Sequence, residues 1–202
     1  MDEPSTRQTI LEAVVSGIEK YGIEKITVRK IAEEVGTNIA SINYYFRSKQ
    51  KLLEETLSMT INHMAEDVIA ITEEEDKNFR IILGDVFRYL IGGAQQFPGI
   101  TTAHLYSAVI KKDYESPGAA GMRRAFNYLV NRATTALPDK DPDYLRYVLA
   151  QLFYAVMFTM LAPGFLEVSE KFAVENAENR VMLAGKYADM FFAIVNQESV
   201  SQ

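Results

Sequence analysis

A cluster of basic side chains gives this sequence its most specific binding chemistry. Between residues 25 and 51 six basic side chains stand against two acidic ones, which gives this segment a net charge of +4. The whole chain of 202 residues has a formal net charge of −6, so the remainder carries −10. Lys and Arg side chains supply most of the non-specific affinity for nucleic acid by neutralising phosphates. A basic segment in an acidic chain therefore indicates local binding to nucleic acid. The basic residues are Lys25, Arg29, Lys30, Arg47, Lys49 and Lys51.

The chain has no pattern that indicates catalysis. It contains no cysteine, which excludes disulfides and thiolate chemistry, and only two histidines, His63 and His104. A glycine-rich phosphate loop, an HExxH motif, a GxSxG motif and a recognisable Ser-His-Asp set are all missing from the sequence. We therefore predict that the chain is not an enzyme, and we expect no cofactor and no metal ion.

The basic side chains need short helices to bring them onto one surface. Thr27 suits the N-cap of a helix that ends at Gly36, and a second short helix is expected from about Asn38 to about Phe46. Two short helices joined by a tight turn form a helix-turn-helix, whose second helix enters the major groove of DNA. Its small core is expected to contain Tyr21, Ile31, Val35, Ile42 and Phe46.

Apolar residues recur at steps of three and four along nearly all of the chain, and no segment alternates as a strand does. The predicted fold is all-α with about nine helices. Residues 1–50 are expected to form the helix-turn-helix domain, and residues 51–202 are expected to form a larger helical domain. A helix over about residues 48–72 is expected to link the two domains. Residues 147–162 are apolar except for Gln151 and Thr159, but sixteen residues are too few to cross a membrane. With no signal peptide visible either, a cytoplasmic location is expected.

The segment from Thr27 to Gly36, with the sequence Thr-Val-Arg-Lys-Ile-Ala-Glu-Glu-Val-Gly, is followed by Asn38-Ile-Ala-Ser-Ile-Asn-Tyr-Tyr-Phe46 and the pair Ser48-Lys49. This pattern resembles the DNA-binding domain of the TetR family of bacterial repressors over about residues 6–58. The remaining two thirds resembles the family in length and helical character only. The resemblance implies an N-terminal DNA-binding domain followed by a ligand-binding and dimerisation domain.

Carried over by position, the resemblance implies a set of DNA contacts on the two short helices and the start of the next one. Tyr44 and Tyr45 are expected to face DNA, whereas Phe46 is expected in the core. Asn43 stands where the commonest family pattern has a tyrosine, so its role is open. The predicted contacts are Thr27, Arg29, Asn38, Ile39, Ser41, Asn43, Tyr44, Tyr45 and Lys49.

The larger domain offers candidates for a ligand site and for a dimer interface, although aromatic and apolar residues at helical spacing are more often plain core. The last helix carries a 3-4-3-4 apolar series and a second apolar stripe beside it, so one stripe can serve the chain's own core and the other a partner. The ligand candidates are Phe87, His104, Tyr106, Tyr128 and Phe158. The candidates for the dimer interface are Val174, Ala177, Val181, Ala184, Ala188, Phe191 and Val195.

The sequence therefore predicts a homodimeric transcriptional repressor that binds a palindromic operator in double-stranded DNA. A small apolar or aromatic effector is expected to release it, and no membrane is expected among its partners. The alternative is an all-helical module that binds a ligand or a protein without touching DNA.

Overall fold

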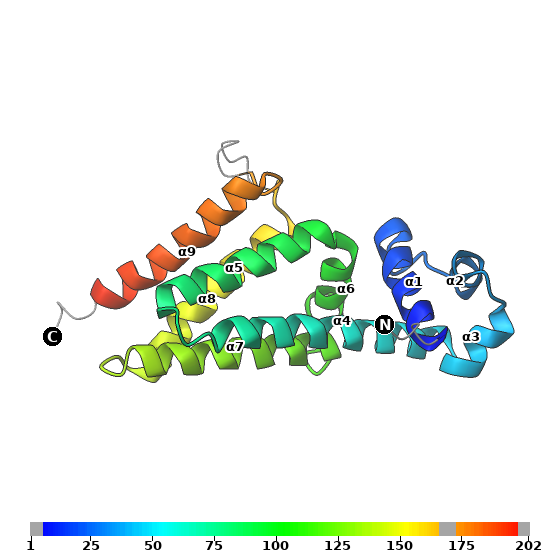
Figure 1. Ribbon diagram of the computed structural model, residues 1–202, viewed down its shortest axis with the longest axis horizontal. Helices are drawn as coiled ribbons and strands as arrows, with labels where there is room; N and C mark the ends of the chain where they lie inside the picture. The colour runs from blue at the N-terminus through cyan, green and yellow to red at the C-terminus, as the bar shows by residue number, and fades with distance from the viewer. Residues whose placement is uncertain (1–5, 166–172, 198–202) are drawn as a thin grey trace. The chain divides into compact units, whose positions relative to one another are not determined.

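The computed structural model describes residues 6–165 and 173–197, and these residues form nine α-helices and no β-strand (Figure 1). The predicted all-α fold is confirmed. The first residues of the chain, on which the expectation about a signal peptide rests, lie outside the described ranges. The helices are α1 (Thr6–Tyr21), α2 (Val28–Val35), α3 (Ile39–Phe46), α4 (Lys49–Thr72), α5 (Phe79–Gln96), α6 (Pro98–Val109), α7 (Pro117–Ala136), α8 (Pro142–Leu161) and α9 (Ala177–Gln197).

The helices group into two compact units. The N-terminal unit comprises residues 1–64 and 99–121, and the C-terminal unit comprises residues 65–98 and 122–202. This division differs from the predicted boundary at residue 50, because α6 packs with the N-terminal helices although it lies far from them in sequence. The long helices α4 and α7 each contribute residues to both units.

One apolar cluster forms the core of the N-terminal unit. Of the predicted core residues, Ile31, Ile42 and Phe46 are buried, whereas Tyr21 and Val35 are half-buried. The cluster also includes two residues of α6, so this helix is part of the same hydrophobic core. Its members are Ile10, Leu11, Val14, Ile18, Ile26, Ile31, Ala32, Ile42, Phe46, Leu52, Ile100 and Ala103.

Side-chain caps set the ends of the two short helices. The Thr27 hydroxyl oxygen accepts a hydrogen bond from the Lys30 N–H at 3.3 Å, which confirms Thr27 as the N-cap of α2. Gly36 ends α2 with φ +70°, a conformation that glycine adopts without steric cost. Asn38 Oδ1 accepts from the Ser41 N–H at 2.8 Å and caps α3. These caps satisfy backbone donors that a helix of only eight residues leaves unpaired at its first turn.

A carboxylate from α1 holds the start of α6. Glu19 accepts hydrogen bonds from the Gly99 N–H at 2.9 Å and from the Ile100 N–H at 2.7 Å, one through each carboxylate oxygen. A negative charge is also favourable at a helix N-terminus because of the helix dipole. A Cβ on Gly99 would lie 3.0 Å from the Ile18 carbonyl oxygen, so the close approach of the two helices requires glycine there.

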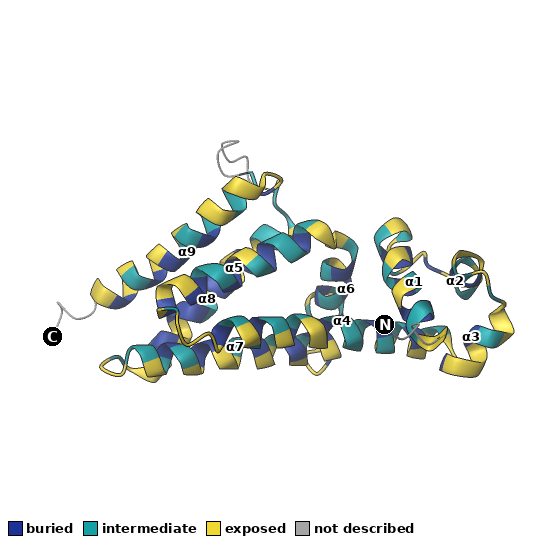
Figure 2. Cartoon of the chain, viewed as in Figure 1, coloured by how far each residue is buried: buried dark blue, intermediate teal, exposed yellow. Residues whose placement is uncertain are grey.

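The core of the C-terminal unit lies where α5 packs against α8 and α9. The rings of Phe79 and Phe191 meet edge-on with centroids 5.6 Å apart, and Phe87 meets Tyr187 in the same way at 5.9 Å. Buried residues line the side of α9 that faces α5, whereas the opposite side of α9 is largely exposed and the rest of α5 is mostly half-buried (Figure 2). These contacts make α9 part of the chain's own core.

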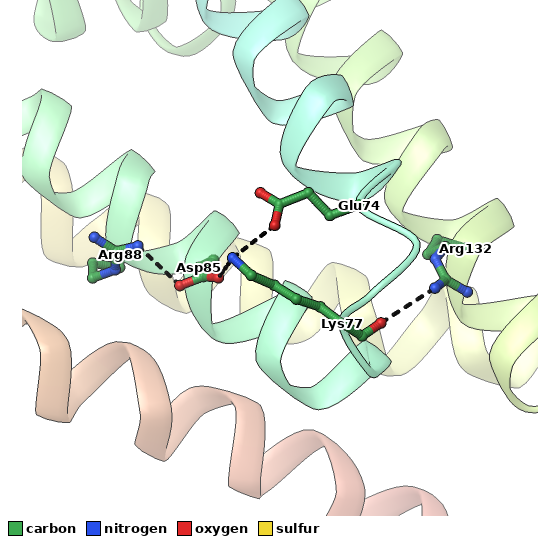
Figure 3. A network of polar contacts seen from close by, with 5 residues as sticks. All are labelled: Glu74, Lys77, Asp85, Arg88 and Arg132. Atoms are coloured by element: carbon green, nitrogen blue, oxygen red, sulfur yellow. Dashed lines mark hydrogen bonds and ion pairs between the residues drawn. The ribbon is translucent and has the colours of Figure 1, made fainter.

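A polar network stabilises the turn between α4 and α5 (Figure 3). The Lys77 ammonium lies between two carboxylates, 2.8 Å from Glu74 and 2.7 Å from Asp85, and Arg88 donates to Asp85 at 2.9 Å. Burial of the Asp85 carboxyl opposes its ionisation, but the hydrogen bonds from Lys77 and Arg88 outweigh burial and lower its pKa. The Arg132 guanidinium donates to the Lys77 carbonyl oxygen at 3.5 Å, which attaches this turn to α7.

Helix α8 is long and apolar enough to cross a membrane by length and composition alone. Its inward residues form part of the core of the C-terminal unit. The buried residues are Leu145, Val148, Leu149, Leu152, Phe153 and Val156.

Candidate nucleic-acid interface

Helix α3 has a buried side and an exposed side. Ile42 and Phe46, four residues apart, point into the core with exposed fractions of 1% and 2%. Tyr44 is 82% exposed and Ile39 is 45% exposed. This arrangement leaves a free helical surface of the size that the major groove of DNA admits.

Seven of the nine predicted contacts are exposed, and the remaining two, Ser41 and Lys49, are half-buried. All nine belong to the N-terminal unit and lie on α2, on α3, at their N-caps or at the start of α4. Since the oxygens of Thr27 and Asn38 already accept hydrogen bonds from the backbone, these side chains can offer DNA their remaining hydroxyl and amide donors. Their contact with DNA stays a prediction.

The predicted base-reading residue Arg29 is paired within its own helix. Its Nε donates to Glu33 Oε1 at 3.0 Å, and the two side chains are 80% and 64% exposed. An ion pair this exposed contributes little to stability, so Arg29 can exchange Glu33 for DNA at small cost. The neighbouring Glu34 is turned the other way and accepts a hydrogen bond from the Ser16 hydroxyl at 2.8 Å.

The N-terminal helices are similar in sequence to known proteins. Residues 10–56 match the family model described as bacterial regulatory proteins, tetR family. The HTH-type transcriptional regulator BetI of Yersinia pestis (strain Pestoides F) is 33% identical over 66 residues, which is 33% of this chain and 33% of BetI. BetI 2 of Chromohalobacter salexigens is 32% identical over 68 residues, 34% of this chain and 33% of that protein. The matched region thus spans about a third of the length of these relatives. Residues 10–56 are therefore similar to the DNA-binding segment of TetR-family regulators.

The fold of the whole chain is also that of TetR-family regulators. The crystal structure of a TetR-family regulator from Streptomyces coelicolor matches with a TM-score of 0.71 at 13% identity, over 100% of this chain and 85% of that one. The regulator FadR from Bacillus subtilis, solved in complex with stearoyl-CoA, matches with a TM-score of 0.67 at 15% identity, over 91% and 96% of the two chains. These relatives and neighbours are transcriptional regulators rather than enzymes, in agreement with the prediction from the sequence.

Ala40 lies on the exposed side of α3 and was missing from the predicted contacts. It lies four residues before Tyr44 and is exposed like it. A small apolar side chain at this place can approach the methyl group of thymine. The i, i+4 spacing from Tyr44 is the signal that identifies it, since these positions share one face of a helix.

A cleft of about 1260 Å³ opens within the N-terminal unit beside Lys49, and His104 lies in its wall. His104 Nε2 lies 3.0 Å from the Thr60 hydroxyl oxygen. Its Nδ1 is buried and has no hydrogen-bond partner among the described residues. Burial lowers the pKa of His104 to about 4, so the imidazole is neutral at pH 7.

The five ligand candidates are distributed over both units, so their binding of a ligand stays a prediction. Only His104 and Tyr106 line the cleft of the N-terminal unit, whereas the other three belong to the C-terminal unit. Phe87 is 0% exposed and packs on Tyr187, so it is a core residue. Tyr128 and Phe158 are 42% and 50% exposed on α7 and α8. Helical spacing alone does not tell whether a residue lies in the core, on the surface or in a pocket, because that depends on its tertiary contacts.

Most of the predicted dimer interface lies inside the chain's own core. Five of the seven residues are at most 2% exposed, so they have no surface left for a partner and their assignment to the interface is wrong. The stripe packs on α5, where Ala188 lies 4.0 Å from the position of a Cβ built on Gly84. Val181 is 57% exposed, and Ala177 is also exposed. The five buried residues are Val174, Ala184, Ala188, Phe191 and Val195.

Proposed function

We propose that the protein is a transcriptional repressor that binds double-stranded operator DNA through α3. The observation that carries this proposal is the exposed side of α3, with Tyr44 82% exposed, next to Lys49 in a TetR-family segment. Side chains such as Asn43 and Arg29 suit base edges, and Lys49 suits a phosphate. The basic segment supplies the attraction to DNA that the acidic remainder of the chain lacks.

The proposed repressor is a homodimer that joins through the exposed apolar residues of α8 and α9. A large apolar surface on a soluble protein marks an interaction site, and self-association of like surfaces gives a two-fold dimer. Such a dimer presents two recognition helices to successive major grooves about 34 Å apart, so the operator is a near-palindrome. The exposed residues are Tyr147, Tyr154, Phe158 and Leu161 on α8, with Val181, Met182, Met190 and Ile194 on α9.

A small apolar or aromatic effector is proposed to release the repressor from DNA in the cytoplasm. The neighbour FadR from Bacillus subtilis, which was solved with stearoyl-CoA, supports a ligand with a large apolar part. The effector needs only to bind the conformation with low DNA affinity more tightly than the other. Because α4 and α7 each contribute residues to both units, these two helices can carry the change.

Two substitutions test the proposal through different contacts. Lys49→Ala is expected to weaken binding to all duplexes and to reduce the salt dependence, the slope of log K against log salt, by about one unit per subunit. Arg29→Ala is expected to relax the preference at one base position of each half-site while it retains binding to random DNA better. Fluorescence anisotropy with a selected operator and with a random duplex measures both effects.

Lys186→Ala is the matched control, because it removes the same charge from an exposed position on α9. It is expected to bind both duplexes like the wild type. If Lys49→Ala and Lys186→Ala bind alike, Lys49 does not contact phosphate. If the wild-type protein binds no duplex, it is instead a helical module that recognises a ligand or a protein.

A further inference from the structure

The chain makes an unusual turn directly after the recognition helix. Arg47 has φ +63° and ψ −34°, and it is one of two residues other than glycine with positive φ in the described ranges. The Ser48 N–H donates to the Phe46 carbonyl oxygen at 2.7 Å, which closes a three-residue turn around Arg47. A γ-turn with positive φ at its centre is rare and strained for residues that carry a Cβ. Glycine would make this turn without that strain.

The turn holds the Arg47 side chain in the open at the end of α3. Its backbone N–H donates to the Asn43 carbonyl oxygen at 2.9 Å, so the residue is attached to the last turn of the recognition helix. The side chain is exposed, and no described residue forms an ion pair with its guanidinium. In this respect it differs from Arg29, which is paired with Glu33, and from Arg7, which is paired with Glu55.

We infer that Arg47 is a further DNA contact, which binds a backbone phosphate at the edge of the groove that α3 enters. It lies in sequence between the exposed face of α3 and the proposed phosphate ligand Lys49, at the point where the chain leaves the recognition helix. A guanidinium binds phosphate through two parallel hydrogen bonds, and such contacts set the position of a protein on the duplex. This role explains why a strained turn carries arginine where glycine is the easier residue. The inference rests on the proposed binding of DNA.

Arg47→Gly is the decisive variant, because it removes the strain and the guanidinium together. The melting temperature is expected to rise by about 2 °C, while the Kd for the operator rises about tenfold at 0.15 M salt and the salt slope falls by about one unit per subunit. A residue that only shapes the turn would not produce a gain in stability together with a loss of binding. A lower melting temperature would show that the turn carries no strain and would overturn the argument.

Lys112→Gly is a matched control from the same chain. Lys112 is the second residue with positive φ, at +57°, and it is exposed in the turn after α6, outside the helix-turn-helix. The substitution replaces a residue with positive φ by glycine and removes one positive charge there too, so the melting temperature is expected to rise and DNA binding to stay at the wild-type level. Arg47→Gly with the affinity and salt slope of this control would overturn the inference.

Two further variants keep the strained turn and change only the side chain. Arg47→Lys keeps the positive charge and is expected to bind within a few-fold of the wild type, with an unchanged salt slope. Arg47→Gln loses the charge and is expected to show the same fall in slope as Arg47→Gly. Equal slopes for the two variants would overturn the phosphate contact, whereas a wild-type protein that binds no duplex would overturn the proposed function itself.

Discussion

His104 makes the stability of the protein depend on pH between about pH 4 and pH 6.5. Its folded-state pKa is about 4 because of burial, against 6.5 for an ordinary histidine. The unfolded chain therefore binds more protons than the folded chain between pH 4 and pH 6.5. The stabilising contribution is complete above pH 6.5 and is lost as the pH falls toward 4, by about 3 kcal/mol in all at 1.36 kcal/mol per pKa unit.

Between pH 7.5 and pH 5.5 the expected loss from His104 is about 1.4 kcal/mol, which is within reach of urea unfolding. His104→Leu replaces the imidazole by an apolar side chain of similar size that cannot take up a proton. The free energy of unfolding of the wild type should fall by this amount more than that of His104→Leu between the two pH values. The comparison removes the contribution of Asp85, whose lowered pKa acts in the same direction at more acidic pH. Parallel pH profiles for the two proteins would refute the reasoning.

Two substitutions, one in each unit, test the packing of helices within that unit. Glu19→Ala removes the acceptor of two N–H groups at the start of α6 and is expected to lower the free energy of unfolding by about 2 kcal/mol. The control Glu12→Ala, on the exposed side of α1, is expected to change it by less than about 0.5 kcal/mol. Equal urea midpoints for the two variants would contradict the contact between Glu19 and α6. Phe191→Ala is expected to cost about 4 kcal/mol because it empties the contact between α9 and α5. Met190 is the preceding residue and is 49% exposed, so Met190→Ala is expected to cost far less. A lower melting temperature for Met190→Ala than for Phe191→Ala would contradict the placement of α9.

The helix-turn-helix was predictable because local chemistry determines it. Thr27 and Gly36 set the ends of one helix by hydrogen bonding and by backbone conformation, and both signals act within a few residues of sequence. The burial of Phe46 beside two exposed tyrosines also follows from helical spacing once Ile42 is assigned to the core. The all-α fold follows from the same periodicity, repeated along the chain.

The predictions that failed depend on contacts between residues that are far apart in the sequence. Two apolar stripes on the last helix were recognised, but only the packing of Ala188 on α5 shows which stripe is internal. The attachment of α6 to the N-terminal unit depends on Glu19, some eighty residues before the N–H groups that it binds. From the sequence, Arg47 was recognised only as one of the basic residues, because a positive φ at a residue other than glycine cannot be predicted from the residue type.

Selection of operators from a pool of random duplexes by the purified protein tests the central claim most directly. The enriched sequences should form a near-palindrome with half-sites about one helical turn apart. Two chains should bind each duplex, with an affinity that falls steeply between two salt concentrations. A pool without enrichment, with binding that is weak at both salt concentrations, would contradict a DNA-binding role for the exposed side of α3.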